Sequence, residues 1–341
     1  MIKFNKPMIG KKDLESVLYC MIKDDLSPGD YLKTFSSMLS KELNLNNVAV
    51  FNTYFNSFES LFHLLGASPG DEIIIPSFAR YGILYSIRKC RLKPVLIDLA
   101  EDSLLPSFDG IRKILSKNTR CIIIPQMFGI PHDISRYHDF CLPVIEDIDG
   151  SIGSAVNGKP IGRFGTFVTM NFNDNAILTT GSGGLAASMD KRLGSLIRSL
   201  KDEISITDCL MNDFNASLGI SQLTQLKKIL DIRRKIGECY DEAVMASGCT
   251  LVGRDEGKEL SYSSYVVKTE TPLIDCMRSF KRYGIPVKRG VEKPLHSYLN
   301  LEARKYVNTE EMYRKLIALP IYPTLTQEDI GNIVKGIRTI L

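Results

Sequence analysis

Short apolar runs alternate with amphipathic stretches between about residues 48 and 190. The runs cover 48–51, 72–77, 93–99, 121–127, 143–148 and 166–172, and the stretches cover 56–66, 80–90, 107–117 and 132–140. Continuous apolar runs of this length are typical of strands that are buried on both faces. The segment 181–188 adds a glycine-rich turn and one more strand. This alternation predicts an α/β fold with a mostly parallel sheet.

The remainder of the chain has a different pattern. Residues 214–247 repeat apolar positions at intervals of three and four, which predicts a long helix that links two domains. A strand, a helix and a closing amphipathic helix follow, and Thr326 with Asp329 indicates the cap of the closing helix. We therefore expect a large domain at 1–213 with an N-terminal helical segment, the linking helix, and a small α+β domain at 248–341.

Composition and charge narrow the class of protein. The chain has 341 residues, of which 44% are hydrophobic and 24% are charged, as in globular proteins. The net charge of +4 is modest, and no basic block is interleaved with aromatic residues, which argues against nucleic acid as a partner. Because no apolar run approaches about 18 residues and no leader precedes the first strand, we expect no membrane span and a cytoplasmic location.

Cysteine and histidine spacing gives no sign of a metal site. The 8 cysteines lie far apart without a C-x-x-C pair, and the 4 histidines form no ligand pattern. We expect reduced thiols and no bound metal.

Eight phrases in the chain occur in a recognisable order. They are GASPGDEIIIPSF (66–78), KPVLIDL (93–99), IIIPQMFGIPHDI (122–134), VIEDIDGSIGS (144–154), GKPIGRFGTF (158–167), ILTTGSGG (177–184), ASLGISQLTQL (216–226) and LPIYPTLTQED (319–329). Together they resemble the DegT/StrS family of nucleotide-sugar aminotransferases. The resemblance implies a fold type I homodimer that binds pyridoxal 5′-phosphate between its domains. It also implies amino transfer to a nucleotide-linked keto sugar, in the synthesis of surface polysaccharides.

In this resemblance, three residues surround the ring of the cofactor. Asp147 matches the carboxylate that keeps the pyridine nitrogen protonated, although it also reads as an acid that caps a turn after a strand. Its neighbours Glu146 and Asp149 suggest a solvated acidic loop or a cation site. Arg80 stands where an aromatic residue stacks on the ring, and it also suits a solvated helix start. Gly150 replaces a glutamine that helps to hold the cofactor or the sugar.

The phosphate of the cofactor is expected at the start of the helix at 56–66. Backbone N–H groups and the helix dipole attract an anion there, and Asn56 and Ser57 are candidate donors. Tyr54-Phe55 replaces the Gly-Thr pair of the family, so the close backbone approach that glycine permits is lost. Asn171 matches a polar phosphate contact at the end of a strand. Asp208 matches an asparagine that reaches the phosphate from the other subunit.

Two residues of the small domain are candidates for substrate binding. Arg289 suits bidentate recognition of the diphosphate of a nucleotide sugar. His296 lies in a loop that approaches the substrate in the family, although a lone loop histidine is more often structural.

Ala176 occupies the position of the family's Schiff-base lysine. In the phrase FNDNAILTTGSGG the family has FNGNKIITTGGGG, and alanine has no nitrogen with which to bind the cofactor or carry a proton. Two explanations remain open at this point. The chain is a natural pseudoenzyme that binds a nucleotide sugar or a partner protein, or it is an engineered Lys→Ala variant of an active aminotransferase. The changes at Tyr54-Phe55 and Gly150 favour natural loss, and the intact frame around Ala176 favours engineering.

Overall fold

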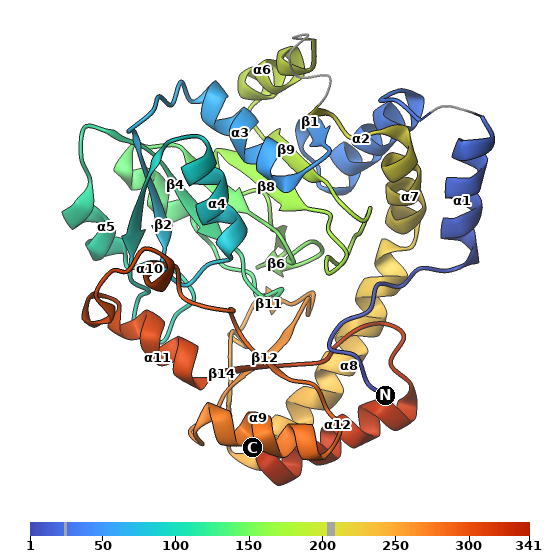
Figure 1. Ribbon diagram of the computed structural model, residues 1–341, viewed down its shortest axis with the longest axis vertical. Coiled ribbons are helices and arrows are strands. Elements are labelled where there is room, and N and C mark those ends of the chain that lie inside the picture. The colour runs from blue at the N-terminus through green and yellow to red at the C-terminus, as the bar shows by residue number, and fades with distance from the viewer. Residues whose placement is uncertain (24–25, 203–208) are drawn as a thin grey trace.

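The computed structural model describes residues 1–23, 26–202 and 209–341, so Asp208 lies outside the described residues. Helices and strands alternate through the first half of the chain (Figure 1). The helices are α1 (Lys11–Ile22), α2 (Asp30–Glu42), α3 (Tyr54–Leu64), α4 (Tyr81–Lys89), α5 (Phe108–Ile114), α6 (Lys191–Asp202), α7 (Asp213–Thr224), α8 (Leu226–Ser247), α9 (Leu273–Arg282), α10 (Leu295–Tyr298), α11 (Val307–Lys315) and α12 (Gln327–Ile340), with 3₁₀ turns η1 (Ser135–Phe140) and η3 (Ala303–Lys305).

In the part of the chain that the structure describes, the strands form three sheets. The strands are β1 (Asn46–Phe51), β2 (Glu72–Pro76), β3 (Lys93–Ile97), β4 (Thr119–Pro125), β5 (Val144–Asp147), β6 (Ala155–Val156), β7 (Lys159–Pro160), β8 (Phe167–Asn171), β9 (Gly184–Ser188), β10 (Thr250–Leu251), β11 (Lys258–Glu259), β12 (Tyr265–Lys268), β13 (Lys288–Arg289) and β14 (Leu316–Leu319). The sheet orders are β1-β9-β8-β5-β4-β2-β3, β10-β12-β14-β13 and β11-β6-β7.

The large sheet has seven strands and is mostly parallel, which confirms the predicted fold class. Strand β9 is the exception, because it runs antiparallel to both β1 and β8. The chain returns directly from β8 to β9 through residues 172–183, without the crossover helix that a parallel connection needs. This return loop carries Ala176 to the carboxyl end of the sheet.

Both faces of the large sheet are buried, as its apolar runs predict. Along β4, Ile122 and Ile124 face one core cluster, while Cys121 and Ile123 face another. The alternation follows from the two-residue period of a strand. The first cluster includes residues from α2, α5 and α8, and the second is covered by α3 and α4.

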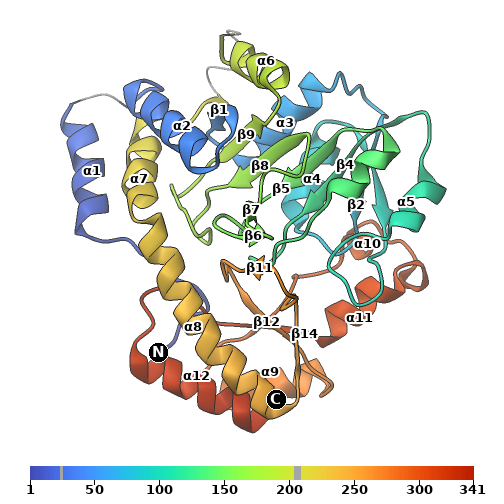
Figure 2. The same cartoon turned by 180° about the vertical axis from the view of Figure 1, so that it is seen from behind.

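The small domain has its own antiparallel sheet and core. Helices α8, α9 and α12 pack on this core, and Ile2 and Phe4 at the start of the chain pack against it as well. Both ribbon views place the N-terminus beside α8 and α12 (Figures 1 and 2). The first residues therefore lie with the small domain, whereas the sequence assigned them to the large one. Thr326 is the N-cap of α12, and its side chain accepts a hydrogen bond from the Asp329 N–H at 3.1 Å, as predicted.

The stretch 214–247 forms two helices, α7 and α8, which meet at Gln225. The Gln225 side chain donates hydrogen bonds to Asp13 Oδ1 and to the Ser221 carbonyl. Helix α7 packs against α1 and α2 in the large domain, while α8 extends to the small domain (Figure 2). Among the described residues, none of the helices combines the length and the apolar character needed to cross a bilayer.

Candidate functional site

A cavity of about 760 Å³ lies between the large sheet and the small domain. Its wall on the large-domain side comes from the starts of α3 and α4, the turn after β5, and the loop between β8 and β9. Ligands of α/β proteins commonly bind at this carboxyl edge of a parallel sheet. Phe4 and Asn5 contribute from the N-terminal segment, and β13 and β14 contribute from the small domain.

Several residues singled out in the sequence meet in this cavity. Its lining includes Arg80, Gly150, Asn171, Ala176 and Arg289. Asp147 lies just beneath, with 2% of its surface exposed. Asn56, Ser57 and His296 are not among the lining residues.

Asp147 ends β5 and is enclosed by protein. Burial raises the pKa of its carboxyl group to about 6, although Arg80 and the neighbouring Tyr54 both favour the charged form. The carboxylate also accepts a hydrogen bond from the Asp149 N–H at 3.1 Å. Asp147 therefore caps the turn after the strand, and Asp149 and Gly150 of this turn line the cavity.

Asp149 and Glu146 are buried rather than solvated, contrary to the open acidic loop suggested by the sequence. Glu146 accepts hydrogen bonds from the N–H groups of the glycine-containing segment 162–165, which explains its burial. Asp149 forms an ion pair with Arg80, whose side chain is 35% exposed. The sequence did not indicate this pair, because its members lie on different connections of the sheet.

Gly150 leaves room for the Arg80 side chain. Its φ of +82° lies in the left-handed region that favours glycine. A Cβ atom at this position would lie 3.0 Å from the Arg80 guanidinium and 2.8 Å from Ser263 Oγ. A side chain at this position, such as the glutamine that the family resemblance leads us to expect, would therefore crowd Arg80 and Ser263.

Tyr54 is the first residue of α3, and its side chain turns toward Asp147. Its hydroxyl oxygen is buried. Burial and the adjacent Asp147 carboxylate raise the pKa of Tyr54 well above its usual value, so the phenol stays protonated. The ring packs edge-on against Phe58, with a centroid distance of 5.0 Å. Gly82 in α4 lines the other side, where an added Cβ would lie 3.5 Å from the Tyr54 ring.

The donors expected at the start of α3 already have partners. Thr53 caps the helix by accepting a hydrogen bond from the Asn56 N–H. The Asn56 side-chain amide donates to Asn52 at 2.6 Å. Ser57, which is fully buried, donates to the Tyr54 carbonyl at 2.7 Å and lies 2.9 Å from Thr169 Oγ1. These contacts leave neither side chain directed into the cavity.

The loop between β8 and β9 forms a mostly polar wall of the cavity, in which Ala176 contributes an apolar methyl group. Ala176 is 9% exposed, and its N–H donates to the Asn173 carbonyl. Asn171 accepts from the Asn173 N–H at 3.1 Å, so its amide nitrogen is its remaining donor toward the cavity. Ser263 adds a buried hydroxyl without a hydrogen-bond partner.

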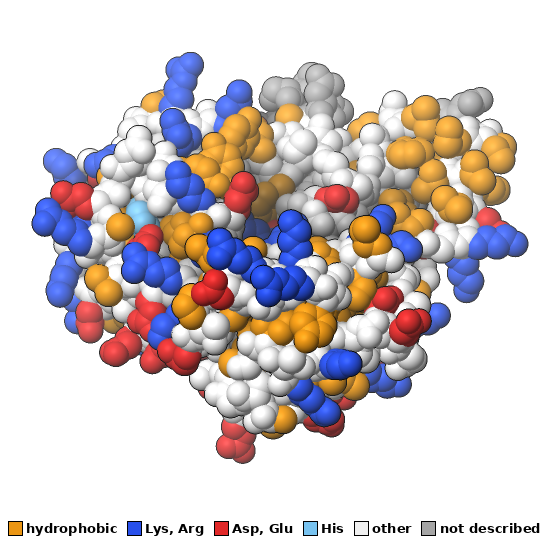
Figure 3. All heavy atoms as spheres, turned by 60° about the horizontal axis from the view of Figure 1, so that its bottom comes forward, with side chains coloured by type: hydrophobic (Ala, Val, Ile, Leu, Met, Phe, Trp, Pro, Cys, Tyr) orange, Lys and Arg blue, Asp and Glu red, His pale blue; other side chains and the backbone are white. Residues whose placement is uncertain are grey.

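Two cations approach the cavity from β13. The Arg289 guanidinium lies 4.5 Å from the Tyr313 ring centroid and donates to the Tyr313 carbonyl. Lys288, which the sequence analysis did not single out, lies with its ammonium 4.6 Å from the Phe4 ring centroid. Figure 3 turns the lower end of the molecule in Figure 1 toward the viewer, and Lys and Arg side chains gather across the middle of this face. A concentration of positive charge such as this favours an anionic ligand.

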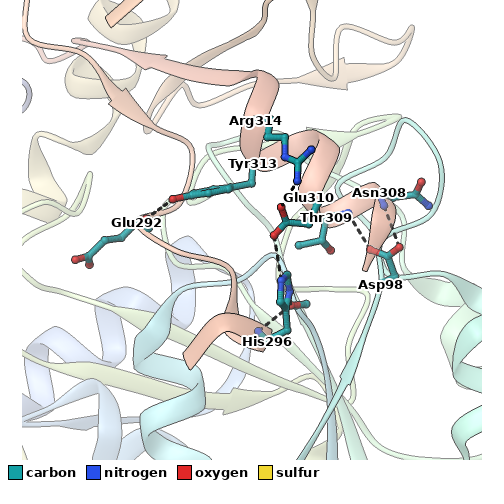
Figure 4. A network of polar contacts seen from close by, with 9 residues as sticks. Asp98, Glu292, His296, Asn308, Thr309, Glu310, Tyr313 and Arg314 are labelled. Carbon is teal, nitrogen blue, oxygen red and sulfur yellow. Dashed lines mark hydrogen bonds and ion pairs between the residues drawn. The ribbon is translucent and has the colours of Figure 1, made fainter. Parts of the chain in front are cut away.

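His296 belongs to a buried network of its own (Figure 4). Its Nδ1 lies 2.8 Å from Ser77 Oγ, its Nε2 lies 3.0 Å from Glu310, and its ring stacks on Tyr306. Only 1% of His296 is exposed, and both of its ring nitrogens have partners within the protein. It ties α10 to α11 and to the end of β2.

The residues present do not fit pyridoxal phosphate. Ala176 in the cavity wall has no amine that could bind the cofactor, and the Tyr54 hydroxyl and Arg80 already approach Asp147. The polar side chains at the start of α3 are committed to protein partners. Within the described ranges, no group of three or more His, Cys, Asp or Glu residues is placed to hold a metal ion.

Comparison with known sequences gives a family match over nearly the whole chain. The profile of the DegT/DnrJ/EryC1/StrS aminotransferase family matches residues 7–338. GDP-perosamine synthase of Vibrio cholerae is 27% identical, over 92% of this chain and 91% of the relative. The dTDP-4-dehydro-2,3,6-trideoxy-D-glucose 4-aminotransferase of Saccharopolyspora spinosa is 23% identical, over 98% of this chain and 95% of the relative.

Solved structures show the same fold. The aminotransferase TlmJ from Streptoalloteichus hindustanus superposes with a TM-score of 0.90 at 24% identity, covering 99% of this chain and 98% of its own. The pyridoxal phosphate form of Spr1654 from Streptococcus pneumoniae has a TM-score of 0.91 at 21% identity, covering 99% and 98%. At these identities the likeness concerns the fold alone, and it confirms the expected fold type I architecture.

Proposed function

The chain belongs to the DegT/DnrJ/EryC1/StrS aminotransferase family, and we propose that it binds a nucleotide-linked sugar in this cavity without transaminating it. The observation that carries the proposal is Ala176, a methyl group in the cavity wall at the position of the family's lysine. Transamination needs an amine that holds the cofactor and moves a proton, and alanine supplies neither.

Ligand binding is supported by the polar groups that remain. Arg289 and Lys288 offer positive charge for a diphosphate, and the Ser263 hydroxyl and the Asn171 amide offer hydrogen bonds for a sugar. The named activities of the relatives support a GDP-linked or dTDP-linked sugar as the ligand. We also propose a cytoplasmic homodimer that takes part in surface-polysaccharide synthesis, as the family resemblance implies.

Natural loss of activity is the reading that we favour over an engineered substitution. Tyr54, Arg80, Asp149, Gly150 and Ala176 all border one cavity. The changes at Arg80 and Gly150 depend on each other, because the ion pair of Arg80 with Asp149 needs the space that glycine leaves. A single engineered Lys→Ala change accounts for none of the others.

Binding can be measured by isothermal titration calorimetry with GDP-mannose and dTDP-glucose as probes. We expect one of them to bind in the micromolar to millimolar range, and Arg289→Gln to weaken that binding about 10-fold. Arg304→Gln is the matched control, since Arg304 is 81% exposed and is not among the cavity-lining residues. Absence of binding by the unmodified protein, or an equal loss in both variants, contradicts the proposal.

Catalysis is tested separately. With pyridoxal phosphate, glutamate and a 4-keto nucleotide sugar, the unmodified protein should form no amino sugar detectable by mass spectrometry. If the unmodified protein forms the amino sugar, the non-catalytic assignment is wrong. If Ala176→Lys alone restores full activity, the engineered-variant explanation is correct instead.

A further inference from the structure

We propose that the Tyr54 side chain occupies the place of the cofactor ring at Asp147, so that the cavity excludes pyridoxal phosphate even when position 176 carries a lysine. This inference concerns the residues of the cavity floor and does not depend on whether a nucleotide sugar binds. According to this proposal, the cofactor site lacks a lysine and is also blocked by a side chain.

The backbone at Tyr54 is held in place from several sides. Thr53 caps α3, and the Ser57 hydroxyl donates to the Tyr54 carbonyl. Gly184 in β9 approaches so closely that an added Cβ would lie 2.7 Å from the Tyr54 Cα. Because the main chain is fixed on both sides, the direction of the Tyr54 side chain is restricted to the cavity floor.

The Tyr54 ring then fills a slot between α3 and α4. Phe58 packs against one part of it, and Gly82 leaves space on another. At the far end of the ring, the hydroxyl is buried without a hydrogen-bond partner in the structure, and it lies near enough to Asp147 to be affected by the charge of that carboxylate. A planar aromatic ring with a proton donor at its tip therefore stands on the same carboxylate that would hold a protonated pyridine nitrogen.

Arg80 occupies a further part of the space beside Asp147. Its guanidinium is paired with Asp149 and also acts on Asp147. Asp147 therefore already interacts with two protein groups, the Tyr54 phenol and the Arg80 guanidinium. Binding of the cofactor would have to displace the phenol from this carboxyl group.

The first experiment uses pyridoxine 5′-phosphate, which resembles the cofactor but lacks the aldehyde and needs no lysine. We expect calorimetry to detect binding to Tyr54→Gly at least about 10-fold tighter than to the unmodified protein. Tyr54→Phe is the matched control, because it keeps the ring and should bind as weakly as the unmodified protein. Tyr54→Ser replaces Tyr54→Gly if circular dichroism shows that the glycine variant fails to fold.

The second experiment uses pyridoxal phosphate with borohydride reduction and peptide mapping. We expect labelling at position 176 in the double variant Ala176→Lys/Tyr54→Gly, and little or none in Ala176→Lys. Full labelling of position 176 in the single variant overturns the proposal, because this result shows that the cofactor enters past Tyr54. Equal binding of pyridoxine phosphate by all Tyr54 variants also overturns it.

Nucleotide-sugar binding is measured without any pyridoxal compound, so the two proposals fail independently. A protein that binds the sugar and also the cofactor analogue refutes the closed site alone. A protein that binds neither refutes the proposed function and leaves the closed site standing.

Discussion

Asp147 is a buried carboxylic acid whose surroundings disfavour its charged form. It is fully enclosed, and burial raises the pKa of its carboxyl group to about 6 against the pull of Arg80 and Tyr54. A carboxylate in water has a pKa of about 3.9, so the folded protein holds this proton more tightly than the unfolded chain does. The stability contribution of the protonated acid is present below pH 4 and is lost as the pH rises through about 6.

We therefore expect the free energy of unfolding of Asp147→Asn, compared with that of the unmodified protein, to be more favourable at pH 7 than at pH 4. With a pKa of about 3.9 in the unfolded chain and about 6 in the folded protein, the difference in stability between variant and unmodified protein should change by roughly 2 kcal/mol between pH 4 and pH 7. Urea unfolding at both pH values measures it. Asp139→Asn, at an exposed position, should leave the pH dependence unchanged. If the stability of Asp147→Asn relative to the unmodified protein is instead lower at pH 7 than at pH 4, the folded protein favours the charged form of Asp147.

Helix α2 is an element whose start depends on a distant part of the chain. Its N-cap is Gly29, which has no side chain with which to satisfy the first N–H groups. Asp213, the first residue of α7, accepts hydrogen bonds from the N–H groups of Gly29, Tyr31 and Leu32 at 2.8–3.1 Å. Because Asp213 is completely buried, these contacts fasten α2 to α7 beneath the large sheet.

Replacing this cap should weaken the element clearly. We expect Asp213→Ala to lower the free energy of unfolding by about 3 kcal/mol, since it leaves buried N–H groups without acceptors. Asp30→Ala removes an acid from the first turn of the same helix, where the side chain is 87% exposed, and should change stability by less than about 0.5 kcal/mol. Guanidinium unfolding distinguishes the two. Equal effects of the two substitutions would show that Asp213 contributes only charge to the helix.

At the scale of the whole molecule, α8 connects the two domains beside the cavity. Arg233 in this helix is 2% exposed, and its guanidinium donates to the carbonyls of Tyr262 and Ile321 at 3.0 Å. Burial lowers the pKa of this side chain to about 10. Since Ile321 lines the cavity, one buried cation connects the long helix to the cavity wall.

Loss of this cation should lower the stability of the protein. We expect Arg233→Met to lower the free energy of unfolding by about 2 kcal/mol or more, because carbonyl oxygens are left unpaired in the interior. Lys235→Met changes an exposed cation two residues further along α8 and should have little effect. Thermal unfolding compares the variants. A neutral or stabilising Arg233→Met would show that the cost of burying the charge exceeds the value of its hydrogen bonds.

Features within reach of a few neighbouring residues could be predicted from the chain alone. The apolar runs predicted strands buried on both faces, because burial leaves a continuous hydrophobic pattern. The capping of α12 by Thr326 was predictable because its partner, Asp329, is three residues away. The fold type I architecture and the absence of a lysine at position 176 also follow from the sequence.

Only the tertiary structure decided what surrounds that absence. Arg80 and Asp149 pair across different connections, and Tyr54 meets Asp147 across 93 residues of chain. His296 is buried between Ser77 and Glu310, although its sequence neighbours suggested a substrate contact. Strand β9 runs antiparallel because the loop before it turns back directly. Local preferences carry no information about such partners, since each contact depends on where the folded sheet brings distant residues together.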